Sequence, residues 1–335
     1  MPPTHTAHDS LVIGAGLAGL ACARRLADHG RDVCVLDKGR GLGGRLATRR
    51  FQGTHVDGTP FTDGQADHGA RVVHPRTAPF AAWLARAEAA GSAAFWPEAG
   101  GYVGLPGMSG LVAPLAHGLQ ITTGTEAISL QRMVDTDVWC VTLADGGLVH
   151  ARHLVVAIPQ PQARQLLDGY PQATTAIAGA DMAPAYVAIA GFDQRLPTDL
   201  CHARWDHGVI GAVQREAAKP GRTPAAGRRT ADTWVIEATP DWAAAHINLE
   251  KPQGAAHLMA ALGPVLGLTG ALPQPVYLAG HRWRYARTAR ALGQPYVHQP
   301  DLGLGLCGDW CLGAEADCAF TSGQALADAM LAAKA

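Results

Sequence analysis

The feature that most constrains the fold of this chain is a glycine-rich turn near its start. It reads Gly14-Ala15-Gly16-Leu17-Ala18-Gly19, a G-x-G-x-x-G. The apolar run 11–13 before it has the character of a buried parallel strand. Apolar residues then recur at helical spacing as far as Gly30, and a second apolar run, 33–36, ends in Asp37. The pattern predicts a strand, a tight turn, a helix and a second strand.

Each glycine of this turn has a physical reason to be there. Gly14 permits the turn, Gly16 lets a pyrophosphate approach the backbone, and Gly19 lets the helix pack close to the strand. Unpaired N–H groups at the helix start favour phosphate. Asp37 follows Gly14 by 23 residues, where a carboxylate accepts hydrogen bonds from adenosine ribose hydroxyls. The sequence therefore predicts a dinucleotide-binding site; a glycine turn with only a packing role is the alternative.

A second glycine-rich segment follows the second strand directly. It reads Asp37-Lys38-Gly39-Arg40-Gly41-Leu42-Gly43-Gly44-Arg45. Gly43 and Gly44 allow backbone close to a cofactor, and the Arg45 guanidinium can fork onto pyrophosphate oxygens. Lys38 is expected beside the ribose. The segment resembles the G-G-R of the amine-oxidase branch of glutathione-reductase-type flavoproteins, which implies non-covalently bound FAD. A solvated surface loop is the alternative.

The far end of the chain carries a matching motif. Residues 303–310 read as a buried strand ending in Gly308-Asp309, and a helix is expected from Ala319. This resembles the last FAD motif of the same superfamily. The resemblance implies that Asp309 contacts the ribityl chain and that Ala319 and Phe320 lie near the flavin pyrimidine, where a helix dipole stabilises negative charge. The alternative is that Asp309 caps a turn.

The predicted fold class is α/β: a glutathione-reductase-type, Rossmann-like FAD-binding domain with a mixed-sheet α+β substrate domain. An antiparallel ribbon at about 137–153, followed by a buried strand at 154–158, fits the first domain, and Ala127 is expected to pack the adenine. The FAD-binding domain is predicted from 1–75, 101–160 and 300–335, and the substrate domain from 76–100 and 161–299.

Several further segments resemble bacterial renalase-like proteins, which are small members of the flavin amine-oxidase group. They are 39–50, Asp67-His68-Gly69-Ala70, 106–109, 219–222, 234–240, 281–286 and 307–311. The resemblance implies that His68, Gly69 and Ala70 approach the flavin. The chain departs from the pattern directly afterwards, because an aromatic-rich segment is expected where Arg71-Val72-Val73-His74-Pro75-Arg76 stands.

This resemblance implies an FAD-dependent oxidase that takes hydride from the 2- and 6-dihydro isomers of NAD(P)H and passes electrons to O2, giving hydrogen peroxide. Such a donor needs orientation rather than a strong base, so no catalytic residue is assigned. Candidate substrate-wall residues are Trp234, His246, His281, Trp283 and Tyr285. Arg282 and Arg284 are candidates to meet substrate phosphates.

Two alternatives remain open. A classical flavin amine oxidase often holds a lysine near the flavin, but the four lysines are Lys38, Lys219, Lys251 and Lys334, and Lys219 is expected in a Pro-Gly loop. That modestly disfavours amine chemistry. The other alternative is a non-catalytic flavin-binding sensor.

The composition of the chain limits the kinds of binding partner, the cellular location and the metal sites that we expect. A net charge of −1 argues against nucleic acid or an anionic membrane as the main partner. Seven scattered cysteines indicate reduced thiols and a cytoplasmic location. No metal is predicted, because Cys307, Cys311 and Cys318 lack zinc spacing. The longest apolar stretch, 254–272, is expected to be a packed helix broken at Pro264 rather than a membrane span.

Overall fold

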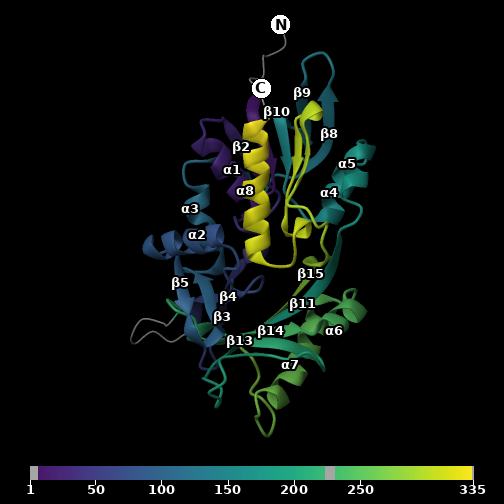
Figure 1. Cartoon of the computed structure of the whole chain (residues 1–335). Helices are drawn as coiled ribbons and strands as arrows, with labels where there is room; N and C mark the ends of the chain where they lie inside the picture. The colour runs from purple at the N-terminus through teal and green to yellow at the C-terminus, as the bar shows by residue number, and fades with distance from the viewer. Residues whose placement is uncertain (1–6, 223–230, 334–335) are drawn as a thin grey trace.

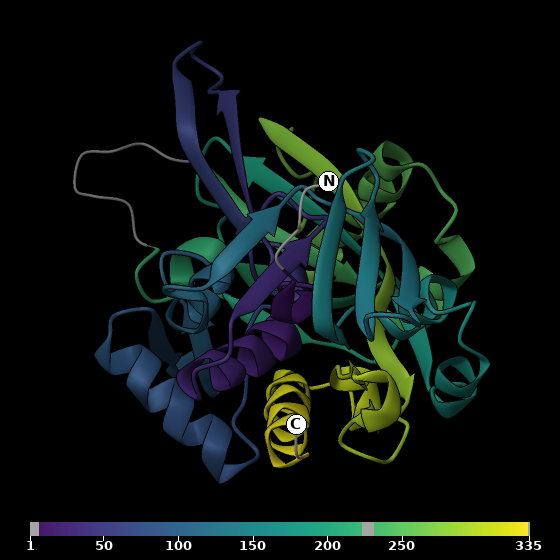
Figure 2. The same cartoon turned by 90° about the horizontal axis from the view of Figure 1, so that it is seen from above.

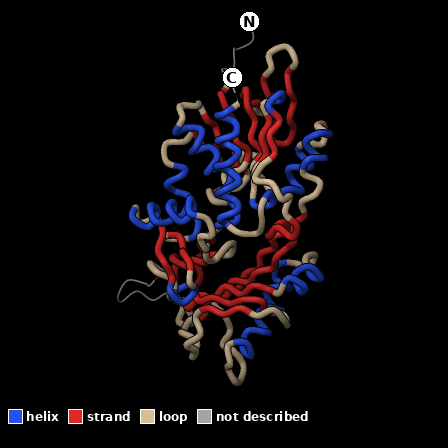
Figure 3. The backbone as a smooth tube through the Cα atoms, in the orientation of Figure 1, coloured by secondary structure: helices blue, strands red, loops and turns tan. Residues whose placement is uncertain are grey.

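Two β-sheets of different construction organise the chain (Figure 1, Figure 3). The computed structural model describes residues 7–222 and 231–333. The first sheet occupies the upper half of Figure 1 and has the strand order β16-β17-β10-β1-β2-β7, with β8 and β9 continuing from β10. Its strands are β1 (His8–Ile13), β2 (Val33–Asp37), β7 (Gln120–Thr123), β8 (Ala127–Met133), β9 (Val138–Leu143), β10 (Leu148–Val156), β16 (Val297–Gln299) and β17 (Leu304–Leu306).

The centre of the first sheet is parallel, from β17 through β10, β1 and β2 to β7. Leu11 and Val12 are fully buried, as expected for strands covered on both faces. One face is covered by α1 (Leu17–Asp28) and α8 (Ala316–Ala332), which lie side by side (Figure 2). A Cβ on Gly323 would overlap the Ala18 carbonyl, so glycine is needed where these helices meet.

The other face of the first sheet packs a second apolar cluster against two short helices, α4 (Gln160–Leu166) and α5 (Pro171–Ala176). The helix α2 (Ala78–Ala89) and the short α3 (Ala113–Ala116) share the α1–α8 core instead. Phe80 and Trp83 of α2 stack around Phe320 of α8. Residues 76–100 were predicted in the substrate domain, yet α2 packs into the core of the first sheet.

The second sheet is antiparallel, with the order β12-β13-β14-β11-β15. Its strands are β11 (Asp181–Phe192), β12 (His202–Arg204), β13 (Ile210–Arg215), β14 (Asp232–Ala238) and β15 (Tyr277–Arg290). Side chains alternate between its faces. Tyr186 and Ala188 pack with α6 (Pro240–His246) and α7 (Lys251–Val265), whereas Val187 and Ile189 pack with Phe51.

Phe51 belongs to a hairpin of β3 (Thr48–Thr54) and β4 (Pro60–Asp67), which extends away from the body of the molecule (Figure 2). A smaller hairpin pairs β5 (Ala93–Trp96) with β6 (Gly101–Gly104). The helix α7 ends one residue after Pro264, close to the predicted break. Within residues 7–222 and 231–333, no helix has both the length and the apolar character that a bilayer crossing requires.

Candidate active site

A cavity of about 1620 Å³ runs from the carboxyl ends of the parallel strands to one face of the second sheet. Open α/β sheets bind ligands at this edge, where neighbouring loops diverge. The glycine-rich turn lines one part of the cavity, and β15 lines another. The cavity therefore joins a cofactor side, built on the first sheet, to a substrate side built on the second.

The glycine turn has the geometry of a phosphate cradle. Gly14 has a φ of +112°, which favours glycine, and a Cβ on Gly19 would overlap the Gly14 carbonyl oxygen. Gly16 caps α1 without a side-chain hydrogen bond, and a Cβ placed there would meet nothing within 4 Å. The start of α1 therefore presents open backbone to the cavity, as a pyrophosphate requires.

Asp37 holds both glycine-rich segments. One carboxylate oxygen accepts from the Ala15 N–H at 2.6 Å and the other accepts from the Gly39 N–H at 2.6 Å. Asp37 and Lys38 line the cavity, and Lys38 Nζ lies 3.4 Å from Glu126 Oε1. The sequence did not predict these two hydrogen bonds to the backbone. Each carboxylate oxygen accepts one of them and keeps another lone pair, so a ribose hydroxyl could still donate to it.

The loop carrying Gly43 and Gly44 lies against the turn. The Gly43 N–H donates to the Ala15 carbonyl at 2.9 Å, and Gly44 has a φ of +54°. A Cβ on Gly44 would come within 3.3 Å of Gly16 Cα. These two glycines are therefore needed for close approach between backbones, as well as for any approach of a cofactor.

Arg45 and Asp309 join the two ends of the chain. The guanidinium makes a two-pronged ion pair with the carboxylate, at 2.8 Å and 2.5 Å, and the Thr288 hydroxyl donates to Asp309 at 2.9 Å. The hydrogen bonds of the Asp309 side chain therefore go to Arg45 and Thr288, and the alternative of a simple turn cap is not what the structure shows. Two residues predicted as separate cofactor contacts are each other's partners.

Most predicted cofactor residues line the cavity. They are Gly14, Gly16, Leu17, Ala18, Asp37, Lys38, Gly43, Gly44, Arg45, His68, Gly69, Ala70, Ala127, Gly308, Asp309 and Ala319. Ala15, Gly19 and Phe320 lie behind this surface. The Phe320 side chain is buried in the aromatic core with Phe80 and Trp83, and α8 begins at Ala316, three residues before the predicted start.

Four lining residues of the substrate side, His281, Val187, Glu237 and Arg204, belong to one row across the second sheet. His281, Val187, Glu237, Ala212 and Arg204 stand opposite one another in register from β15 to β12. Residues opposite each other in antiparallel strands share a face. This face carries charged and aromatic groups toward the cavity, while the opposite face packs on α6 and α7.

Two wall candidates lie away from the cavity, one on a strand and one in a helix. Trp234 is fully buried on the helix side, where its indole N–H donates to Asp232. His246 stacks on Trp242 in α6, and its Nδ1 lies 2.8 Å from the Trp242 carbonyl oxygen. Neither lines the cavity. Glu237 lies three residues after Trp234 on the same strand, so its side chain points to the opposite face, toward the cavity. Glu237 was not among the candidates predicted from the sequence.

His281, Trp283 and Tyr285 do line the cavity, with His68 beside them. The His68 and His281 ring centroids are 4.6 Å apart, and the Trp283 indole N–H donates to the His68 carbonyl at 2.8 Å. Burial, followed by the charge of Arg49, lowers the pKa of His68 to about 4. Burial and then His68 lower the pKa of His281 to about 4. Both rings are therefore neutral at pH 7.

Arginines dominate the charge beside these rings. Arg71 and Arg287 both form ion pairs with Glu237, and Arg204 also lines the cavity. None of the three was a sequence candidate, although the departure from the family pattern at 71–76 marked the first. Arg282 and Arg284, which were candidates, also line the cavity, and their guanidinium groups donate to the Leu249 carbonyl and to Asn248 Oδ1.

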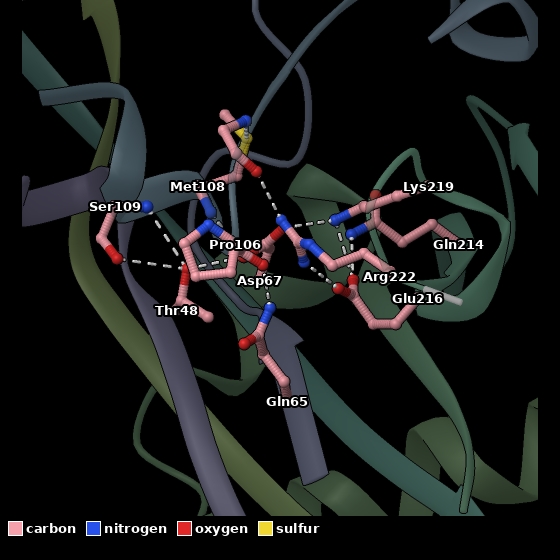
Figure 4. A network of polar contacts seen from close by, with 11 residues as sticks. Thr48, Gln65, Asp67, Pro106, Met108, Ser109, Gln214, Glu216, Lys219 and Arg222 are labelled. Carbon is pink, nitrogen blue, oxygen red and sulfur yellow. Dashed lines mark hydrogen bonds and ion pairs between the residues drawn. The ribbon is translucent and has the colours of Figure 1, made fainter. Parts of the chain in front are cut away.

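A buried ion network adjoins the segment 68–70 through its neighbour Asp67 (Figure 4). Lys219 Nζ donates to Asp67 at 2.6 Å and to Glu216 at 2.8 Å, and Arg222 bonds the same two carboxylates at 2.9 Å. Burial alone would raise the pKa of Asp67, but Lys219 and Arg222 lower it to about 2. Lys219 lies in the predicted Pro-Gly loop, directly before the turn at Pro220-Gly221, yet its side chain is fully buried. The loop's remainder, 223–230, lies outside the described residues, as does Lys334.

Comparison with known proteins agrees with this geometry. Residues 12–87 match the NAD(P)-binding Rossmann-like domain, and residues 82–331 match the flavin containing amine oxidoreductase family. The chain covers only 7% of the curated relatives it matches, the Lysine-specific histone demethylase 1 homolog 3 proteins of Oryza sativa subsp. indica and subsp. japonica. Each match is 44% identical over 54 residues, 16% of this chain.

Two solved structures share the fold over nearly the whole chain. A protein from Exiguobacterium sp. 255-15 assigned as a protoporphyrinogen oxidase is 14% identical, with 97% of this chain and 98% of that chain covered and a TM-score of 0.60. A redesigned putrescine oxidase is 13% identical, with 97% and 99% covered and a TM-score of 0.60.

The glycine-rich turn, the carboxylate of Asp37 and the Arg45–Asp309 pair fit FAD, and the family match covers most of the chain. The chain belongs to the flavin containing amine oxidoreductase family, and its cofactor is FAD.

Proposed function

We propose that this enzyme oxidises the 2- and 6-dihydro isomers of NAD(P)H, with O2 as electron acceptor and hydrogen peroxide as product. The observation that carries the proposal is the substrate wall, where neutral rings adjoin three arginines and a single carboxylate. A dihydronicotinamide nucleotide pairs a planar uncharged ring with anionic phosphates, so it matches both parts of this wall.

The protein's own part in such a reaction is binding and orientation. FAD, when bound, supplies the hydride acceptor and the route to O2. His68, His281 and Trp283 offer flat faces and edges against which a dihydropyridine can stack. Loss of hydride restores aromaticity in the donor and releases no proton, so neutral histidines suffice and no base is required.

We further propose that the predicted cofactor residues that line the cavity hold FAD. The start of α1 and Gly16 face the pyrophosphate, Asp37 faces the adenosine ribose, and Asp309 faces the ribityl chain.

The seven cysteines are all free thiols, which supports a reducing cytoplasmic location.

Amine oxidation is the second candidate, and the family match favours it. Lys251 lines the cavity, and Glu237 is a carboxylate that could receive an ammonium group. However, Arg71 and Arg287 already occupy Glu237. A cationic amine would therefore enter a positively charged chamber, which disfavours it.

The test is anaerobic flavin absorbance of the purified holoenzyme. We would add ordinary β-NADH, a borohydride-reduced NAD mixture that contains the 2- and 6-dihydro isomers, and a panel of primary amines and polyamines, each separately. We expect rapid bleaching by the isomer mixture alone, with peroxide formed when air is admitted. Bleaching by an amine instead would establish the second candidate, and silence with every donor would indicate a flavin-binding sensor.

A further inference from the structure

We propose that Arg71, Arg204 and Arg287 form a subsite for a phosphate group of the substrate, at the corner of the cavity around Glu237. This inference deepens the proposed function and rests on it for the identity of the ligand. The three arginines come from separate parts of the fold: the segment after β4, the strand β12 and the strand β15. Their convergence on one corner is a product of tertiary structure.

The first argument is the charge balance of the corner. Glu237 is the only carboxylate among the lining residues of the second sheet as described, and its two oxygens are taken by Arg71 and Arg287. Arg204 has no hydrogen bond or ion pair within residues 7–222 and 231–333. Three guanidinium groups against one carboxylate leave two positive charges, which a phosphate monoester dianion would neutralise.

The second argument is that nearby acids are committed elsewhere. Asp67 and Glu216 lie in the buried network of Figure 4, where Lys219 and Arg222 each bond both carboxylates. Two acids and two cations balance within that network. The positive charge of Arg71 therefore finds no further partner there, although Glu216 acts on it at a distance.

Electrostatics of the arginines agree with this reading. Burial and then Arg204 lower the pKa of Arg71 to about 9, and burial and then Arg71 lower the pKa of Arg287 to about 10. Both groups remain charged at pH 7. Because the three cations destabilise one another, a bound dianion would gain energy from all of them.

The position of the corner suits a nucleotide. Glu237 stands two strands from His281 in the same row, which corresponds to about 10 Å at the usual strand spacing of about 4.8 Å. A ring stacked on His281 and Trp283 would therefore be separated from the arginines by a gap that a ribose can bridge. Arginine suits such a site because its planar fork matches phosphate oxygens.

The experiment compares ligands with and without phosphate on the holoenzyme. Binding of oxidised nicotinamide mononucleotide and of nicotinamide riboside would be measured by titration calorimetry, and reduction by their 2- and 6-dihydro forms by anaerobic absorbance. Arg204→Gln and Arg287→Gln should weaken mononucleotide binding about tenfold each and leave riboside binding within about twofold, a tenfold change being about 1.4 kcal/mol. Arg290→Gln is the matched control, since it lies on the same strand outside the cavity.

The two proposals fail in different ways. If no dihydronicotinamide reduces the flavin while mononucleotide binding still depends on Arg204 and Arg287, the proposed function is wrong and the phosphate subsite stands. If the dihydro forms reduce the flavin but both variants affect riboside and mononucleotide equally, the subsite is overturned. Failure of the wild-type protein to prefer mononucleotide over riboside would also overturn it.

Discussion

The cofactor side and the substrate side of the cavity are built by different means. On the cofactor side the surface is largely backbone, presented by glycines and by the start of α1. On the substrate side it is side chain, delivered by residues of four strands, β11, β12, β14 and β15, and by the segment after β4. A surface made of backbone requires residues without a Cβ, so that chain segments and a cofactor can approach it closely. A surface made of side chains depends on the burial and the charge of those side chains. The two sides should therefore break under different mutations.

The largest effect is expected at the charge network behind the substrate side. Lys219→Met would remove one of the two cations that the buried Asp67 and Glu216 share and leave two carboxylates with Arg222 alone, which should cost about 3–5 kcal/mol of unfolding free energy. Urea unfolding of the apoprotein measures this. Lys251→Met, at an exposed lysine, should change the same quantity by less than about 0.5 kcal/mol. Equal losses in the two variants would contradict the network's structural role.

On the cofactor side, two neighbouring glycines should separate folding from binding. Gly19→Ala places a Cβ onto the Gly14 carbonyl and should cost about 1–3 kcal/mol of apoprotein stability. Gly16→Ala meets no protein atom within 4 Å and should change apoprotein stability by less than about 1 kcal/mol, yet weaken FAD binding. Thermal melting and flavin occupancy together test the pair. If Gly16→Ala retained full flavin, the cradle would be assigned wrongly.

A smaller change is expected where the chain ends meet. Asp309→Ala removes the partner of Arg45 and Thr288 and should weaken FAD retention about tenfold, about 1.4 kcal/mol, with little loss of fold. Equilibrium dialysis against FAD measures the affinity. Asp301→Ala, at an exposed site in the turn before β17, serves as the control. Full flavin occupancy in Asp309→Ala would mean that the C-terminus does not close the site.

The smallest effect is a pH dependence of the ring cluster. His68 and His281 have pKa values lowered to about 4, so the unfolded chain, near 6.5, binds more protons than the folded one between these values. Their contribution is present above about pH 6.5 and is lost as the pH falls toward 4. The melting temperature should fall less steeply over this range in His281→Gln than in the wild type. Parallel curves for the two proteins would refute the assignment.

Much of the cofactor side was predictable because its signals are local. The glycines and Asp37 lie within one strand–turn–helix–strand unit, so spacing along the chain reports spacing in space. The Gly308-Asp309 motif near the C-terminus was predictable for the same reason, because it directly follows a short apolar strand. What spacing did not predict is the pairing of Asp309 with Arg45, which are separated by 264 residues.

The substrate side was less predictable. The composition of a strand does not say which face each side chain occupies or which residue of the neighbouring strand it pairs with. Trp234 and Glu237 lie three residues apart on β14 and point to opposite faces, so an attractive aromatic residue belongs to the core and an overlooked acid belongs to the cavity. Lys219 likewise follows a short turn and resembles an exposed loop residue, yet it is buried between two carboxylates.

By itself, the sequence determined the strand–turn–helix–strand unit, the FAD assignment and the α/β class, because short-range backbone geometry demands glycine, an acid and an apolar strand at set intervals. Only the tertiary structure decided which side chains share the substrate wall. Arg71, Arg204 and Arg287 meet because strand register and a loop bring them to one corner of the cavity. This convergence depends on contacts between residues far apart in the sequence, and such contacts produce no periodic sequence pattern.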